Sequence, residues 1–174
     1  NAVVEGTAVV GGTAWVGGTA RVGGNARVEG TARVGGTAWV GGTARVGGTA
    51  RVEGTAWVGG TAVVEGTARV GGNAVVGGNA VVEGNAHLTE TTHHATIGPG
   101  GSRGATLTLC RTQGGGHCYF TGCFSGTYSV LKAACRVRHG IESPHYAAYG
   151  AAATALWRLV MGAAPLPTDP EPTP

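Results

Sequence analysis

The first half of the chain alternates apolar and polar positions with a period of six residues. From Val4 to His87 the phrase Val-[Gly/Glu]-Gly-[Thr/Asn]-Ala-X is repeated 14 times without an insertion or deletion. Val holds the first position as far as Val82, and Ala holds the fifth position from Ala8 to Ala86. A short, strict period predicts a solenoid, in which each repeat buries its apolar residues against its neighbours.

This phrase resembles the hexapeptide signature of left-handed parallel β-helices, which has an aliphatic first residue, Gly, Ala, Glu or Asp second and a small fifth residue. The resemblance implies triangular coils of three short strands, about 18 residues each. Val at position one and Ala at position five are expected to point inward. Gly at positions two and three, and Asn at position four, tolerate the positive φ that tight corners need. The left hand of the helix is implied by the family alone.

Position six faces solvent, and taking every eighteenth residue sorts it into three columns. These are Val3, Arg21, Trp39, Trp57 and Val75; Val9, Arg27, Arg45, Val63 and Val81; and Trp15, Arg33, Arg51, Arg69 and His87. Trp39 above Trp57, flanked by valines, predicts an exposed apolar stripe of the kind that marks protein contacts. The interface candidates are Val3, Trp39, Trp57, Val75, Trp15, Val63 and Val81. The alternative is that these residues are simply good strand formers.

The column of Arg33, Arg51 and Arg69 is a candidate site for a polyanion, because aligned guanidinium groups suit phosphate or sulphate. The alternative is a solvated, charge-balanced face, since glutamates recur at position two. The formal net charge of +3 and the 12% of charged residues are too mild to imply nucleic acid. No apolar run of about 18 residues predicts a membrane span.

Nothing in the repeats points to a reaction. Hexapeptide acyltransferases resemble this pattern but use a catalytic His and loops between coils. The repeats have no such loops, and their only His is the last outward residue, His87. Trimeric carbonic anhydrases of the same fold need spaced zinc-binding histidines, whereas His87, His93 and His94 are close together in the chain. We therefore expect no enzyme activity, no catalytic residue, no metal site and no cofactor.

A second segment follows the repeats, so the predicted divisions are a solenoid (1–93), a small module (94–163) and a proline-rich tail (164–174). Residues 105–111 and 117–123 read as a hairpin, followed by helices near 128–138 and 144–161. Val130, Ala134 and Val137 are expected to form the apolar stripe of the first helix. Ser143 and Pro144 mark the start of the second helix, on which Tyr146, Tyr149, Ala153, Leu156 and Val160 are expected to share one face. The predicted fold is mainly β: a left-handed parallel β-helix followed by an α+β (ββαα) module.

The motifs Ile97-Gly-Pro-Gly-Gly-Ser-Arg103, Gly122-Cys-Phe-Ser-Gly-Thr127 and His139-Gly140 resemble a small domain that follows hexapeptide repeats in uncharacterised bacterial and phage proteins. That resemblance implies architecture and no activity.

The four cysteines are Cys110, Cys118, Cys123 and Cys135. A hairpin centred on Gly114 places Cys110 opposite Cys118, close enough for a disulfide, with Cys123–Cys135 as the second pair. The alternative is four reduced, buried thiols.

These patterns favour a structural protein. Its partners are expected to be copies of itself, in a filament or oligomer joined through open coil ends and outward Trp/Val faces. The first coil begins in phase with the repeat, and an open coil edge is a template for another chain. The alternative is a binding module for a polysaccharide or another polyanion. Localisation outside the cell, or on a cell or virion surface, is favoured.

Overall fold

The computed structural model describes residues 1–100, 104–122 and 124–166, and residues 1–88 form a parallel β-solenoid of about five coils. Cys123 and the tail from residue 167 onward lie outside the described residues. Each strand is two residues long, holding positions six and one of the repeat. The strands are β1 (Val3–Val4), β2 (Val9–Val10), β3 (Trp15–Val16), β4 (Arg21–Val22), β5 (Arg27–Val28), β6 (Arg33–Val34), β7 (Trp39–Val40), β8 (Arg45–Val46), β9 (Arg51–Val52), β10 (Trp57–Val58), β11 (Val63–Val64), β12 (Arg69–Val70), β13 (Val75–Val76), β14 (Val81–Val82) and β15 (His87–Leu88).

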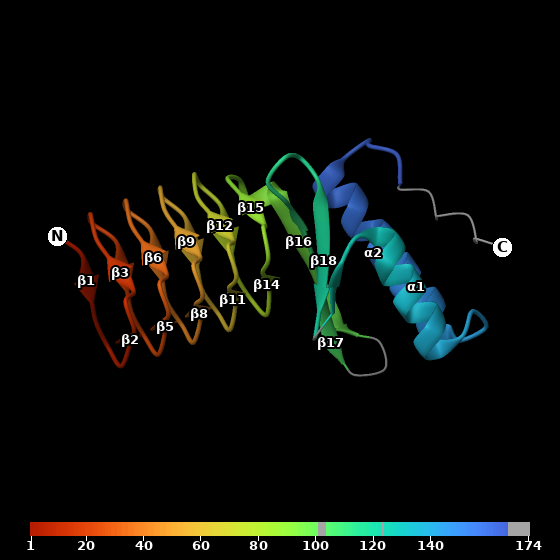
Figure 1. The fold of residues 1–174 in the computed structure, drawn as a ribbon, viewed down its shortest axis with the longest axis horizontal. Coiled ribbons are helices and arrows are strands. Elements are labelled where there is room, and N and C mark those ends of the chain that lie inside the picture. The colour runs from red at the N-terminus through yellow and green to blue at the C-terminus, as the bar shows by residue number, and fades with distance from the viewer. Residues whose placement is uncertain (101–103, 123, 167–174) are drawn as a thin grey trace.

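Every third strand lies in the same sheet, which gives three parallel five-stranded sheets (Figure 1). Sheet A holds β1, β4, β7, β10 and β13; sheet B holds β2, β5, β8, β11 and β14; sheet C holds β3, β6, β9, β12 and β15. The register pairs each residue with the one 18 positions later, as in Trp39 with Trp57. The three predicted columns are therefore confirmed.

The solenoid core consists of the Val at position one and the Ala at position five. From Ala20 to Ala86 these side chains are essentially inaccessible to solvent, as in Val40 and Ala44. Each buried Val contributes about 1.5–3 kcal/mol, so the stability of the core is a sum of small, similar terms.

The backbone conformation requires glycine at position three of the repeat and not at position two. All 14 position-three glycines, from Gly6 to Gly84, have φ between 54° and 71°, and no described non-glycine residue has a positive φ. Position two and the position-four Asn, which can tolerate this conformation, do not adopt it. Position four instead carries a ladder in which Thr Oγ1 donates to a glycine carbonyl of the next coil, as from Thr49 to Gly66 at 2.9 Å.

After the short 3₁₀ helix η1 (Thr91–His93), an antiparallel sheet of four strands follows the solenoid, in the order β16-β17-β18-β19. Its strands are β16 (His94–Gly100), β17 (Ala105–Arg111), β18 (His117–Thr121) and β19 (Phe124–Gly126). The hairpin of β17 and β18 was predicted; β16 and β19 were not. Two helices, α1 (Tyr128–His139) and α2 (Pro144–Met161), complete the module.

The four-stranded sheet closes the C-terminal end of the solenoid (Figure 1). On its inner face Cys110 and Phe120 belong to the same buried cluster as the solenoid core. On its outer face Leu109 and Tyr119 pack with α1 and α2. The Val81 amide donates to Thr108 Oγ1 at 3.2 Å, so the last coil finds hydrogen-bond partners in the sheet. We refer to β16–β19, α1 and α2 together as the cap.

The two helices differ in how well their buried faces follow from the sequence. On α1 the buried residues are Tyr128, Leu131 and Cys135, whereas Val137, placed in the predicted stripe, is 89% exposed. Val130 and Ala134 are exposed as well, so that prediction was wrong. On α2 the predicted face is confirmed: Ala153, Leu156 and Val160 are buried, Tyr146 and Tyr149 pack against them, and Trp157 joins them.

Candidate functional site

The outward residues of sheet A form one apolar stripe. Trp39 and Trp57 are stacked, with ring centroids 5.1 Å apart and an interplanar angle of 15°. Val75 continues the column and is 41% exposed. Val3 lies at the far end of the same sheet, separated from Trp39 by Arg21. We call Trp39, Trp57 and Val75 the Trp stripe.

The indole rings of this stripe pack directly on position-two glycines. A Cβ added to Gly41 would overlap the Trp39 ring, and one added to Gly59 would overlap the Trp57 ring. Both glycines are buried, and both indoles are half-buried as a result. Glutamate, which occupies position two elsewhere, would displace the rings. The flat aromatic surface therefore depends on which residue follows each Trp by two positions.

The other interface candidates lie on different faces. Trp15 is on sheet C beside Arg33 and is 54% exposed. Val63 and Val81 are neighbours on sheet B and are half-buried. The structure thus joins two of the predicted tryptophans and leaves the third alone.

Sheet C carries the arginine column as predicted. Arg33, Arg51 and Arg69 occupy neighbouring strands and are all exposed. Among the described residues of the solenoid, Arg27 forms an ion pair with Glu29, at 3.8 Å. The three column arginines form no ion pair with an acid among the described residues.

Cys110 and Cys118 are directly opposite each other across β17 and β18, as the hairpin prediction required. They are nevertheless free thiols, as is Cys135. Burial raises the pKa of all three thiols. The predicted partner of Cys135, Cys123, lies outside the described residues. The disulfide prediction is therefore unconfirmed.

His93 and His94, near the last coil, have different surroundings. His93 Nδ1 accepts from the Thr89 amide at 3.2 Å, and His94 is partly buried, with no hydrogen-bond partner for its Nδ1 among the described residues. Burial lowers the pKa of both imidazoles. Among residues 1–100, 104–122 and 124–166, no group of three or more His, Cys, Asp or Glu side chains is placed to hold a metal ion.

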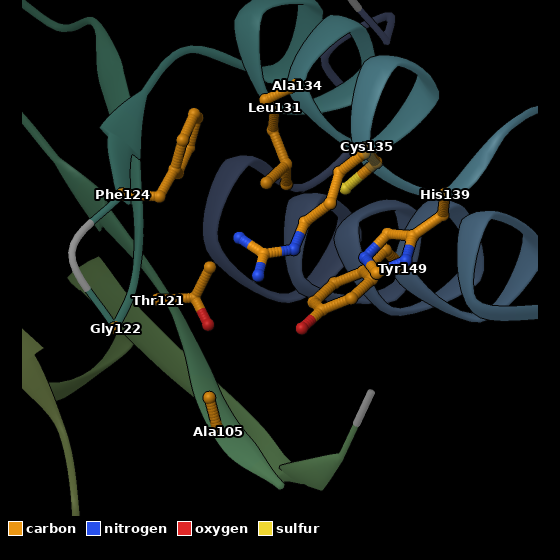
Figure 2. A pocket seen from close by; sticks show the side chains of 10 residues that line it. Ala105, Thr121, Gly122, Phe124, Leu131, Ala134, Cys135, His139 and Tyr149 are labelled. Carbon is orange, nitrogen blue, oxygen red and sulfur yellow. The ribbon is translucent and has the colours of Figure 1, made fainter. Parts of the chain in front are cut away.

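A cavity of about 220 Å³ lies in the cap, between the outer edge of the sheet and the two helices (Figure 2). Sequence reasoning missed it. Its lining comes from strands and helices far apart in the chain, and no local pattern marks them. The lining residues are Ala105, Thr121, Gly122, Phe124, Leu131, Ala134, Cys135, Arg138, His139 and Tyr149.

Comparisons with protein-family models, with curated proteins and with solved structures give no match. The structure supports a parallel solenoid with coils of about 18 residues, whereas membership of the hexapeptide-repeat family remains a resemblance. None of the described helices is long and apolar enough to cross a membrane.

Proposed function

We propose that this chain is a structural protein, a capped β-solenoid that associates with copies of itself through the Trp stripe. The observation that carries the proposal is the stacked pair Trp39–Trp57, which is half-buried against position-two glycines and continued by the exposed Val75. Aromatic residues are enriched at the centres of protein interfaces, where they bury a large area at little cost in side-chain entropy.

The regularity of the solenoid supports a structural role. Coils follow one another every 18 residues without an inserted loop, so the outward faces repeat at the spacing of parallel strands, about 4.8 Å. A partner surface with the same repeat would match the Trp stripe over several strands at once. A second copy of this chain meets that requirement, because its own outward faces have the same strand spacing.

The cap restricts how copies can be arranged. Because β16–β19 cover the last coil, that end offers no open solenoid edge, contrary to the expectation of two open ends. In the first coil, the inward residue Val4 is 49% exposed, and Val10 is exposed too. Any segment that pairs with this edge, from the same chain or from another copy, has to present strands in the same three-sided arrangement.

The test compares two substitutions that remove tryptophan from different faces. In the double variant Trp39→Thr/Trp57→Thr the stripe is lost, while Thr keeps a high strand propensity. Trp15→Thr is the matched control, because Trp15 also lies over position-two glycines but has no aromatic neighbour. Far-UV circular dichroism checks that both variants are folded.

Light scattering coupled to size exclusion, with negative-stain electron microscopy, reads out assembly. We expect concentration-dependent oligomers or filaments from the unmodified chain and from Trp15→Thr, and monomers from the double variant. A monodisperse monomer at high concentration for the unmodified chain would refute the proposal. Equal loss of assembly in the two variants would refute the assignment to the Trp stripe.

A second candidate, binding of a polysaccharide or another polyanion, is supported by the arginine column. Arg33, Arg51 and Arg69 are exposed, neighbouring and without an acidic partner among the described residues. Repulsion between like charges on adjacent strands is relieved when a chain of anionic groups lies along them.

Heparin chromatography tests this candidate. The triple variant in which the three column arginines are changed to Ser should elute at lower salt than the matched triple variant Arg21→Ser/Arg27→Ser/Arg45→Ser. The matched variant removes the same number of positive charges, but from sheets A and B. Equal elution of the two variants would show unspecific charge attraction, and no retention of the unmodified chain at low salt would exclude the candidate.

A further inference from the structure

The cavity in the cap combines an apolar wall with a polar one. Phe124 and Leu131 supply apolar surface from β19 and α1, together with the methyl groups of Ala105 and Ala134. The polar groups come from Thr121 on β18, Arg138 near the end of α1 and Tyr149 on α2. Figure 2 shows the hydroxyl groups of Thr121 and Tyr149 pointing toward one another across the cavity.

Thr121 has a buried hydroxyl with no hydrogen-bond partner among the described residues. Such groups are uncommon in folded proteins, because a buried polar atom that loses water and gains nothing destabilises the fold. Since Thr121 lines the cavity, a molecule seated there is in a position to supply the missing partner. Two neighbouring rings hold the opposite wall in place: His139 stacks on Tyr149, with centroids 6.1 Å apart and planes at 19°.

Basic side chains outnumber acidic ones in the described part of the cap, and Arg138 is the one that lines the cavity. The side chain of Arg138 forms no hydrogen bond or ion pair with another described residue. The only acidic side chain among the described residues from 94 to 166 is Glu142. The basic side chains there are Arg111, Lys132, Arg136, Arg138 and Arg158. A guanidinium with free donors and an adjacent hydroxyl matches a carboxylate in shape and charge.

We propose that this cavity binds a small organic carboxylate. Arg138 pairs with the carboxylate, the hydroxyls of Thr121 and Tyr149 hydrogen-bond to the ligand, and Phe124 with Leu131 packs on its apolar part. The volume of about 220 Å³ is below the usual 300–1,000 Å³ of drug-sized sites, which restricts the ligand to a single ring or a short chain. The apolar wall favours such a ligand over inorganic phosphate.

The test uses benzoate as the probe, with benzamide as its neutral isostere and inorganic phosphate as an anion without an apolar part. Titrations followed by ¹H–¹⁵N spectra of the full chain report both the site and the affinity. Benzoate should shift the amide signals of Thr121, Gly122 and Tyr149 in a saturable way. Benzamide should bind more weakly than benzoate by a factor of about 10 or more, because it lacks the charged group that hydrogen-bonds to the guanidinium. Phosphate should also bind more weakly.

Two substitutions with one matched control locate the interaction. Arg138→Gln should weaken benzoate about 10-fold or more, whereas Arg136→Gln, an exposed arginine on the same helix that does not line the cavity, should leave it unchanged. Thr121→Val should weaken binding and at the same time raise the unfolding midpoint, because it removes the unpaired hydroxyl. A purely structural residue would not move these two quantities in opposite directions.

Four results would overturn the proposal. The first is the absence of saturable shifts with benzoate at the highest soluble concentration. The second is equal weakening by Arg138→Gln and Arg136→Gln, which would mean unspecific charge attraction. The third is unchanged affinity in Thr121→Val, because the ligand is proposed to pair with that hydroxyl. Tighter binding of phosphate than of benzoate would likewise contradict a carboxylate site.

Discussion

The glycine at position three of the repeat supports a quantitative prediction, for which Gly42 in the middle of the solenoid is the test position. Its φ is 67°, and a Cβ there would lie 2.7 Å from the carbonyl oxygen and 3.0 Å from the amide nitrogen of Gly60. Both contacts are with the backbone of the next coil, so no side chain can move aside. The change Gly42→Ala therefore combines a strained backbone with a steric overlap.

The expected loss of stability is the sum of two contributions. A left-handed conformation costs an alanine about 1–2 kcal/mol. Pushing two tightly packed segments apart costs about 1–3 kcal/mol. Together they predict that Gly42→Ala lowers the free energy of unfolding by about 2–5 kcal/mol. For a slope near 2 kcal/mol per molar urea, the unfolding midpoint should fall by roughly 1–2.5 M.

Gly47→Ala is the matched control at position two. Gly47 has no positive φ, and a Cβ there would meet only side-chain atoms of Glu65, the nearest at 3.6 Å. Alanine restricts the unfolded chain at such a site, which stabilises a protein by about 0.4–1 kcal/mol. Urea unfolding followed by tryptophan fluorescence measures both variants. Equal midpoints for Gly42→Ala and Gly47→Ala would refute the reasoning about positions two and three.

The other predictions concern the cap and its junction with the solenoid. Tyr119→Phe should lower the free energy of unfolding by about 1 kcal/mol, because the buried Tyr119 hydroxyl donates to the Ala153 carbonyl at 2.8 Å; this is measured by urea unfolding. Acidification should destabilise the fold below the ordinary imidazole pKa of 6.5. Burial lowers the pKa of His94, so in that range the unfolded chain binds more protons than the folded one. Cys110 and Cys118 should react slowly with iodoacetamide in the folded protein at neutral pH, because burial raises both thiol pKa values; mass spectrometry reads out the labelling.

Each of these expectations has a control and an opposing result. For Tyr119 the control is Tyr146→Phe, and an equal effect of the two changes would contradict a role for the Ala153 hydrogen bond. For the pH effect, His94→Gln should reduce the acid sensitivity while the exposed His145→Gln should not; identical pH profiles would contradict the assignment to His94. For the thiols, rapid labelling before unfolding would contradict burial, and a Cys110–Cys118 peptide in the native protein would establish the predicted disulfide.

The solenoid could be predicted from the sequence because every hexad places Val and Ala at the same two inward positions. Val at position one can be buried only if every strand keeps its phase, and a shift by one residue would turn the core outward. The columns of Trp39 over Trp57 and of Arg33 over Arg51 follow from that phase alone. Helix α2 was predictable for a similar reason, since Ser143 and Pro144 mark its start and its apolar face is long.

Tertiary structure decided everything that depends on contacts between elements. The buried face of α1 was mispredicted because Val130 and Val137 are as apolar as Leu131 and Cys135, and only the positions of the sheet and α2 select between the faces. Strands β16 and β19 exist through pairing with β17 and β18 and carry little signal of their own.

The chemical properties of the surfaces were also decided in three dimensions. Position-two and position-three glycines read alike in sequence. They differ because only position three turns the corner with a positive φ against the backbone of the next coil. The cavity was invisible for the same reason: Thr121, Arg138 and Tyr149 belong to three elements and converge only when the cap packs. Periodic packing is local enough to be read along the chain, whereas a site assembled from distant elements is not.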